Sequence, residues 1–193
     1  MSFRRFASNL FLLAGAAAMP VTLLATQPQA CVAGKPTPES YTWNFRQEAS
    51  QLLEDVQADA MHVNNHADRL EAFATDNNID WRLHAGELDS ISGEVDDIGR
   101  KVCRLEQIRR VVAPWQQKAI DQTALLVRLM ADNTDDAVTF LNANQGQFWM
   151  PAYREYVANV YQESGRLSHS VKTFEEFAKV HREDVHLEHN LGI

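Results

Sequence analysis

Apolar residues between positions 81 and 112 recur at alternating gaps of three and four. That spacing puts their side chains on one face of a long amphipathic helix, as a narrow apolar seam that packs against other helices. Arg109 is the only charged residue on this face. The other seam residues are Trp81, His84, Leu88, Ile91, Val95, Ile98, Val102, Leu105 and Val112. A chain built around this seam is expected to form a helical bundle.

The same alternation on both sides of this segment predicts further helices. A first helix should begin near residue 39 or 40, and the polar run 76–78 should end it before Asp80 caps the next one. Pro114 and Pro151 suit the first turns of the third and last helices. The seam of the first helix is predicted to contain Ala49, Leu52, Val56, Ala60, Val63, Ala67, Leu70 and Ala74.

The third helical segment contains a second set of start and stop signals. Asp132 and Asn133 are typical of a helix end, and Thr134 is a suitable N-cap for a new helix, so a break is expected there. No segment alternates apolar and polar residues over the length of a strand. We therefore predict an all-α fold, an antiparallel up-down four-helix bundle over residues 39–180 with a broken third helix, followed by a polar tail over 181–193.

Residues 1–30 have the layout of a secretory signal peptide. Arg4 and Arg5 precede an apolar run over residues 10–25, and small residues follow at Ala30 and Ala33. The run is shorter than the roughly 20 residues that a membrane-spanning helix needs, which favours cleavage at about residues 25–33 over an uncleaved anchor. An extended arm over residues 31–38 should follow. The chain is accordingly predicted to be exported, to a periplasmic or extracellular location.

The charge balance argues against nucleic acid as a partner. The whole chain carries a net charge of −8, and losing the leader removes two of its 18 bases and none of its 26 acids, which leaves −10. An acidic surface repels phosphate backbones. The expected partner is therefore a protein or a small molecule. A membrane association would require a retained leader or a lipid on Cys31.

Aromatic residues should gather where the second helix begins and the last helix begins. His84 occupies a seam position there, and a buried imidazole must be neutral or paired. One interpretation is a ligand site. The other is a core histidine hydrogen-bonded to a tyrosine hydroxyl or a backbone carbonyl. His84 and Met150 could also serve as axial ligands of a non-covalent haem. The candidate ligand-binding residues are His84, Trp81, Trp149, Met150 and Tyr153.

Two further histidines have a spacing found in metal sites. His62 and His66 are four residues apart, so both imidazoles lie on one face of the first helix. No other histidine is expected at the same level of the bundle. A carboxylate such as Asp59 would have to complete the ligand set. Solvated surface histidines are the competing interpretation.

The two cysteines of the chain define one possible intramolecular disulfide. Cys103 should lie near the end of the second helix, within reach of Cys31 through the short arm. An oxidising compartment would favour the Cys31–Cys103 bond. Removal of Cys31 with the leader, or its acylation, would prevent it.

No pattern of catalytic residues emerges from the sequence. No serine or cysteine has a positional reason to be activated, and the chain lacks a C-x-x-C-H sequence for covalent haem. We therefore expect an exported, non-enzymatic bundle that acts by binding, as a small-molecule sensor, an adaptor or an interaction protein of the cell envelope, with no cofactor. The alternative is a carrier of a divalent metal or of non-covalent haem that uses the bundle histidines. An enzyme is the third possibility, because a general acid and base can lie on a bundle without forming a motif.

Overall fold

The computed structural model describes residues 43–76 and 79–191, with side chains through residue 180. Its elements are α1 (Phe45–Phe73), α2 (Trp81–Ile108), the short 3₁₀ helix η1 (Arg109–Val111), α3 (Pro114–Ala143) and α4 (Pro151–Leu191). No strand occurs within these residues, so the all-helical class is confirmed for the described part of the chain. The predicted leader, the arm and Cys31 lie outside it.

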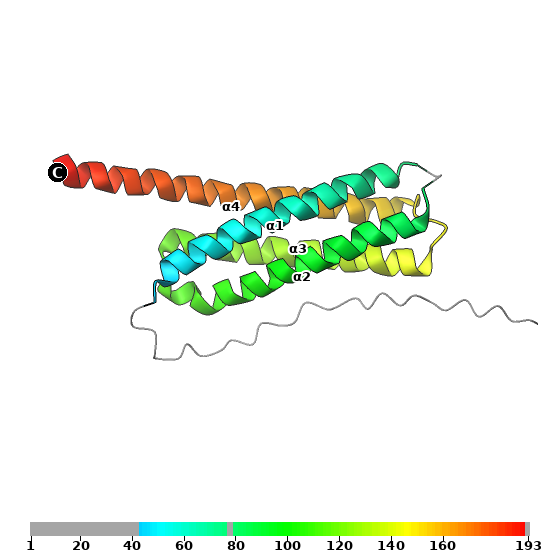
Figure 1. Cartoon of the computed structure of the whole chain (residues 1–193), viewed down its shortest axis with the longest axis horizontal. Coiled ribbons are helices and arrows are strands. Elements are labelled where there is room, and N and C mark those ends of the chain that lie inside the picture. Colours follow the sequence, from blue (N-terminus) through cyan, green and yellow to red (C-terminus); the bar gives the residue numbers. More distant parts are fainter. Residues whose placement is uncertain (1–42, 77–78, 192–193) are drawn as a thin grey trace, which may run out of the picture.

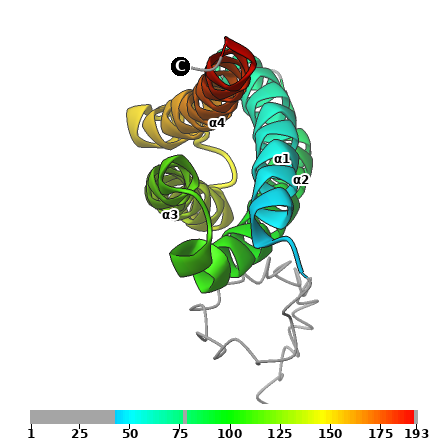
Figure 2. The ribbon, with the colours of Figure 1, turned by 90° about the vertical axis from the view of Figure 1, so that its left-hand side faces the viewer.

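The four long helices lie side by side around a common core. Figure 1 shows them aligned along one axis, and Figure 2 shows the same helices from one end. Each helix packs against its neighbours in the chain, and α1 also packs extensively against α4. Within the described residues, none of the helices contains an apolar stretch long enough to cross a lipid bilayer.

The seam of α2 forms its buried face. The side chains from His84 to Leu105 that were assigned to it are buried, whereas Trp81 is half-buried. The prediction fails at one position, because Ile108 rather than Arg109 is buried there, whereas Val112 is buried as predicted. Arg109 lies in η1 and binds Asp121 of α3, with both nitrogen–oxygen distances at 2.6 Å.

One seam position of α1 was assigned to the wrong residue. Leu53 is fully buried, and the predicted Leu52 is half-buried at the edge of the core. Neighbouring helical residues differ by about 100° around the axis, so the spacing from Ala49 to Val56 allows either leucine. The direction in which the other helices pack selects Leu53. Leu52 is left facing the outside of the bundle, where it lines a pocket described below.

The predicted break in the third helix is wrong, because α3 runs without interruption from Pro114 to Ala143. The hydroxyl of Thr134 is buried and donates to the carbonyl oxygen of Met130 at 2.8 Å, inside the same helix. The amide of Asn133 donates to the carbonyl oxygen of Leu129 and to the carboxylate of Glu163 on α4. Both side chains are occupied by bonds that a helix interior permits, so neither starts a new helix.

The ends of the first and last helices also differ from the prediction. α1 begins at Phe45, because the side chain of Asn44 caps it by accepting from the Gln47 amide at 3.2 Å. α4 continues to Leu191 through the segment predicted as a polar tail, and Figure 1 shows its C-terminal end extending beyond the other helices. No proline or glycine interrupts the sequence between Gly165 and Gly192, so nothing in its local chemistry ends the helix earlier.

Candidate functional site

His84 lies at the centre of an aromatic cluster at one end of the bundle. It is fully buried, and its Nδ1 lies 3.1 Å from the hydroxyl of Tyr153, which is also fully buried. Its ring centroid lies 4.5 Å from that of Phe148 and 5.8 Å from that of Phe73. We call His84, Tyr153, Phe148 and Phe73 the aromatic end.

The aromatic end has no partner for the second nitrogen of His84. Within the described residues, Nε2 is buried and makes no hydrogen bond. Burial lowers the pKa of His84 to about 4, and it raises the pKa of Tyr153 above its usual range. Both side chains are therefore neutral at pH 7. A neutral imidazole beside a tyrosine hydroxyl is the arrangement expected of a core histidine. The surrounding rings pack directly against the imidazole.

The other three residues proposed for this ligand site are more exposed than His84 and Tyr153. Trp81 is half-buried against the core, with the Arg82 guanidinium 5.0 Å from its ring centroid. Trp149 is 53% exposed, and Met150 is half-buried. The structure thus brings His84 and Tyr153 together, and the other rings in contact with His84 are those of Phe148 and Phe73. A ligand role for these residues stays a prediction.

His62 and His66 each face a different carboxylate on α2. The Nδ1 of His66 lies 2.7 Å from Glu87, which Arg69 also binds at 3.1 Å. His62 is mostly exposed and lies 3.7 Å from Glu94. No group of three or more potential metal ligands occurs among the residues that the structure describes. A metal site at His62 and His66 stays a prediction without a third ligand.

Glu87 is the centre of the first of these clusters. Its burial would raise the pKa of its carboxyl, but hydrogen bonds from Arg69 and His66 outweigh that effect and lower it. The carboxylate is therefore held in its charged form. Because Glu87 lies on α2 and its two partners lie on α1, the cluster fixes how these helices align along their length.

The predicted disulfide involves a residue that the structure does not describe. Cys103 lies on α2 and is partly buried. Cys31 belongs to the N-terminal segment outside the described residues, so the Cys31–Cys103 bond stays a prediction.

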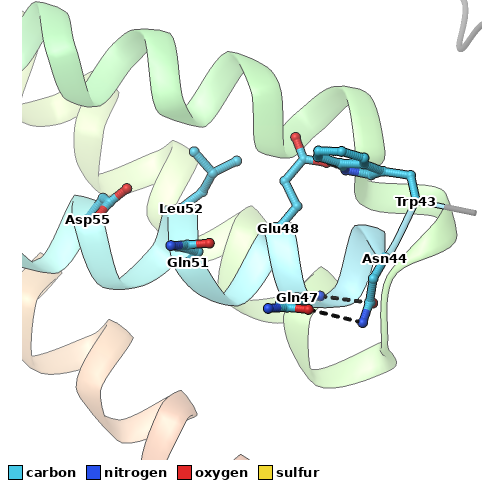
Figure 3. Close-up of a pocket in the computed structure, with 7 residues that line it drawn as sticks. All are labelled: Trp43, Asn44, Gln47, Glu48, Gln51, Leu52 and Asp55. Carbon is cyan, nitrogen blue, oxygen red and sulfur yellow. Dashed lines mark hydrogen bonds between the residues drawn. The ribbon is translucent and has the colours of Figure 1, made fainter. Parts of the chain in front are cut away.

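A pocket that the sequence analysis did not anticipate lies at the beginning of α1, as Figure 3 shows. Its volume is about 400 Å³. The helical residues that line it form adjacent pairs one turn apart along one face of α1, and Trp43 closes one end. The lining residues are Trp43, Asn44, Gln47, Glu48, Gln51, Leu52 and Asp55. We call this site the Trp43 pocket.

A hydrogen bond from its ring nitrogen holds the indole of Trp43 in place. Its Nε1 donates to Glu48 Oε2 at 2.6 Å, and Arg104 of α2 donates to the other carboxylate oxygen at 2.6 Å. The indole is nevertheless exposed, since the residue as a whole retains 61% of its accessible surface. Figure 3 shows the Glu48 side chain reaching toward the ring. The nitrogen is satisfied while much of the aromatic surface remains accessible.

The two carboxylates of the pocket differ in whether they already bind a positive group. The hydrogen bond from Arg104 lowers the pKa of Glu48, and the bond from Trp43 adds to that effect while burial opposes it. Glu48 is therefore charged and already neutralised by Arg104. Asp55 has no hydrogen bond or ion pair within the described part of the chain, and it is exposed. It is the pocket carboxylate that can accept a positive group from outside.

Sequence reasoning missed this pocket because it searched the buried face of the first helix. Trp43 lies just before that helix, and Leu52 was assigned to the seam. A usable signal was present on the opposite side. Gln47, Gln51 and Asp55 recur every four residues behind an off-seam tryptophan, which marks a polar helix face with one aromatic residue at its end.

Comparison with known proteins identifies no relative: no family model, curated protein or solved structure matches this chain. The capabilities of the Trp43 pocket therefore follow from its own side chains. An indole face attracts cations and packs against apolar groups, amides form hydrogen bonds, and a carboxylate binds ammonium or guanidinium groups. Together they favour an organic cation that carries an apolar part.

Proposed function

We propose that this chain is an exported, non-enzymatic binding protein, an up-down four-helix bundle that holds a small organic cation in the Trp43 pocket. The observation that carries the proposal is the combination of an exposed, edge-anchored indole with Asp55, a carboxylate that has no partner in the described residues. Export rests on the signal-peptide layout of residues 1–30.

The chemistry of the pocket supports a cationic ligand. A cation over an exposed tryptophan face contributes about 0.5–1 kcal/mol, and up to about 2 kcal/mol when it is desolvated. The residues from Asn44 to Asp55 extend about 16 Å along the helix axis, so one ligand can contact the indole at one end and the Asp55 carboxylate further along. The acidic net charge of the chain favours the approach of cations over anions.

The same pocket supports binding rather than catalysis. General acid–base chemistry needs a group whose pKa lies near the working pH. The pKa of Glu48 is shifted away from neutrality by Arg104, and its carboxylate already binds the indole. Its role is to orient Trp43.

Two ligands that differ in charge test the proposal. Titration calorimetry of the chain with benzylamine should give saturable binding, whereas benzyl alcohol, which has the same shape without the charge, should bind at least several-fold more weakly. Equal affinity for the two compounds, or no binding of benzylamine, would contradict a cation site.

Single substitutions locate the binding. Trp43→Ala and Asp55→Asn should each weaken benzylamine binding by about 2- to 30-fold, the equivalent of about 0.5–2 kcal/mol. Trp149→Ala is the matched control, because Trp149 is similarly exposed, at 53%, and does not line the pocket. A loss of affinity in the control variant would place the ligand elsewhere.

Export has its own test. The mature protein recovered from outside the cytoplasm should begin between about residues 25 and 33 when its N-terminus is sequenced. A protein recovered only from the cytoplasm with Met1 present would remove export from the proposal and leave the pocket unaffected.

A further inference from the structure

The aromatic end joins all the long helices through one hydrogen-bonded pair. Phe73 is the last residue of α1, His84 lies in the first turn of α2, and Tyr153 lies in the first turn of α4. Tyr153 also contacts Phe140 near the end of α3, with ring centroids 5.8 Å apart. Movement of His84 would therefore disturb contacts to α1 and α4 directly, and contacts to α3 through Tyr153.

The surroundings of His84 suit a neutral imidazole and oppose a charged one. An imidazolium has two N–H donors, but the described residues offer its ring one acceptor, the hydroxyl of Tyr153. From α1 it meets the ring of Phe73, from the segment before α4 the ring of Phe148, and from α4 Tyr153. Tyr153 is the only titratable group among these contacts, and it carries no charge. Among the residues that the structure describes, no carboxylate binds His84.

We propose that His84 is an acid-sensitive latch, whose protonation separates the helix ends at the aromatic end while the opposite end of the bundle stays closed. The proton enters Nε2, which has no acceptor in the closed state and finds water in the open one. The opposite end is held by groups that do not involve histidine. Gln116 of α3 donates to the backbone of Arg46 and to Ser50, and Arg104 binds Glu48.

The size of the effect follows from the two states of the imidazole. A solvated histidine titrates near pH 6.5, whereas His84 in the closed end titrates near 4. Between those values the equilibrium constant for opening rises about tenfold for each unit by which the pH falls. The total increase from pH 7.5 to pH 5 is about 30-fold. The exposed rings of the open end should then bind an apolar dye.

Hydrogen exchange of the full chain, measured by mass spectrometry and corrected for the intrinsic effect of pH, tests the latch. Between pH 7.5 and pH 5, protection should fall by about 30-fold in peptides that cover residues 73–88 and 148–156. Peptides that cover residues 100–120 should change much less. A uniform loss of protection along the chain, or no loss above pH 4, would overturn the proposal.

Two histidine variants complete the test. His84→Gln removes the titrating group, keeps an amide beside Tyr153, and should abolish the pH-dependent binding of anilinonaphthalene sulfonate. His169→Gln is the matched control, because His169 is exposed on α4, and it should behave like the natural chain. If the His84 variant does not fold, the exchange profile of the natural chain still decides. Identical dye binding by the His84 variant and the natural chain would contradict the latch.

Discussion

Different interactions hold the helices together at the two ends of the bundle. At the aromatic end, four rings pack around one hydrogen bond, and His84 and Tyr153 are fully buried. At the other end, hydrogen bonds and ion pairs connect the helices, and the Trp43 pocket lies open beside them. Packed rings exclude water, whereas a polar network tolerates water and leaves surface accessible.

The ends should therefore differ in what their residues contribute to stability. Truncation of a fully buried aromatic side chain lowers the free energy of unfolding by about 3–5 kcal/mol, whereas loss of an exposed ion pair lowers it by about 0–1 kcal/mol. Gln116 is the exception at the polar end, because it is buried and binds two groups on α1. The aromatic end is therefore expected to contribute more to the stability of the fold, and the binding that we propose lies at the polar end.

The largest expected effect is at the aromatic end. Tyr153→Ala should lower the free energy of unfolding by about 3–5 kcal/mol, because it removes a fully buried ring and the partner of His84. Urea unfolding followed by circular dichroism measures the change. Trp43→Ala, which truncates a residue that is 61% exposed, is the control and should cost less than about 0.5 kcal/mol. Equal losses in the two variants would contradict the distinction between the ends.

Acidification should affect the ends unequally. The pKa of His84 is lowered to about 4 in the folded state from about 6.5 in the unfolded state, so its contribution is complete above pH 6.5 and is lost as the pH falls toward 4. The loss amounts to about 3 kcal/mol over that window. Urea unfolding at successive pH values should show a steeper decline for the natural chain than for His84→Gln. Parallel curves would remove His84 as the cause.

Removal of the buried amide at the polar end should have an intermediate effect. Gln116→Ala leaves the carbonyl of Arg46 and the amide of Ala113 without their partner, which costs about 1–3 kcal/mol. Thermal unfolding would measure this loss. The exposed neighbour Lys118 provides the control, since Lys118→Ala should leave the melting temperature nearly unchanged. A neutral Gln116 variant would mean that water replaces its bonds.

The smallest effect is expected from the ion pair beside the pocket. Arg104→Ala should cost about 0.2–1 kcal/mol, and the pKa of Glu48 should rise toward its usual value, because Arg104 is the main cause of its depression. The lowered pKa means that the pair contributes above about pH 4.5 and is lost as the pH falls below it. Carbon-13 NMR titration of the Glu48 carboxyl measures the shift. An unchanged pKa would show that Trp43 alone holds the carboxylate.

Much of the fold could be predicted because it depends on local spacing. The alternation of three and four residues predicts α2 and its buried face, and Asp80 and Pro114 mark helix starts that the structure confirms. The interpretation of His84 as a core histidine hydrogen-bonded to a tyrosine hydroxyl also follows from a local rule, that buried polar groups find partners. The Trp43 pocket could not be predicted in this way, because it lies on a face of α1 that does not belong to the apolar seam.

The sequence alone therefore determined that this chain is helical, because its apolar spacing has the period of a helix and of nothing else. Only the tertiary structure decided which of two adjacent leucines is buried, whether Asn133 ends a helix or binds α4, and which rings contact His84. These choices depend on the direction from which another helix approaches. A one-dimensional pattern records the period of a face, but the angle at which that face meets its neighbour is set by the packing of all four helices.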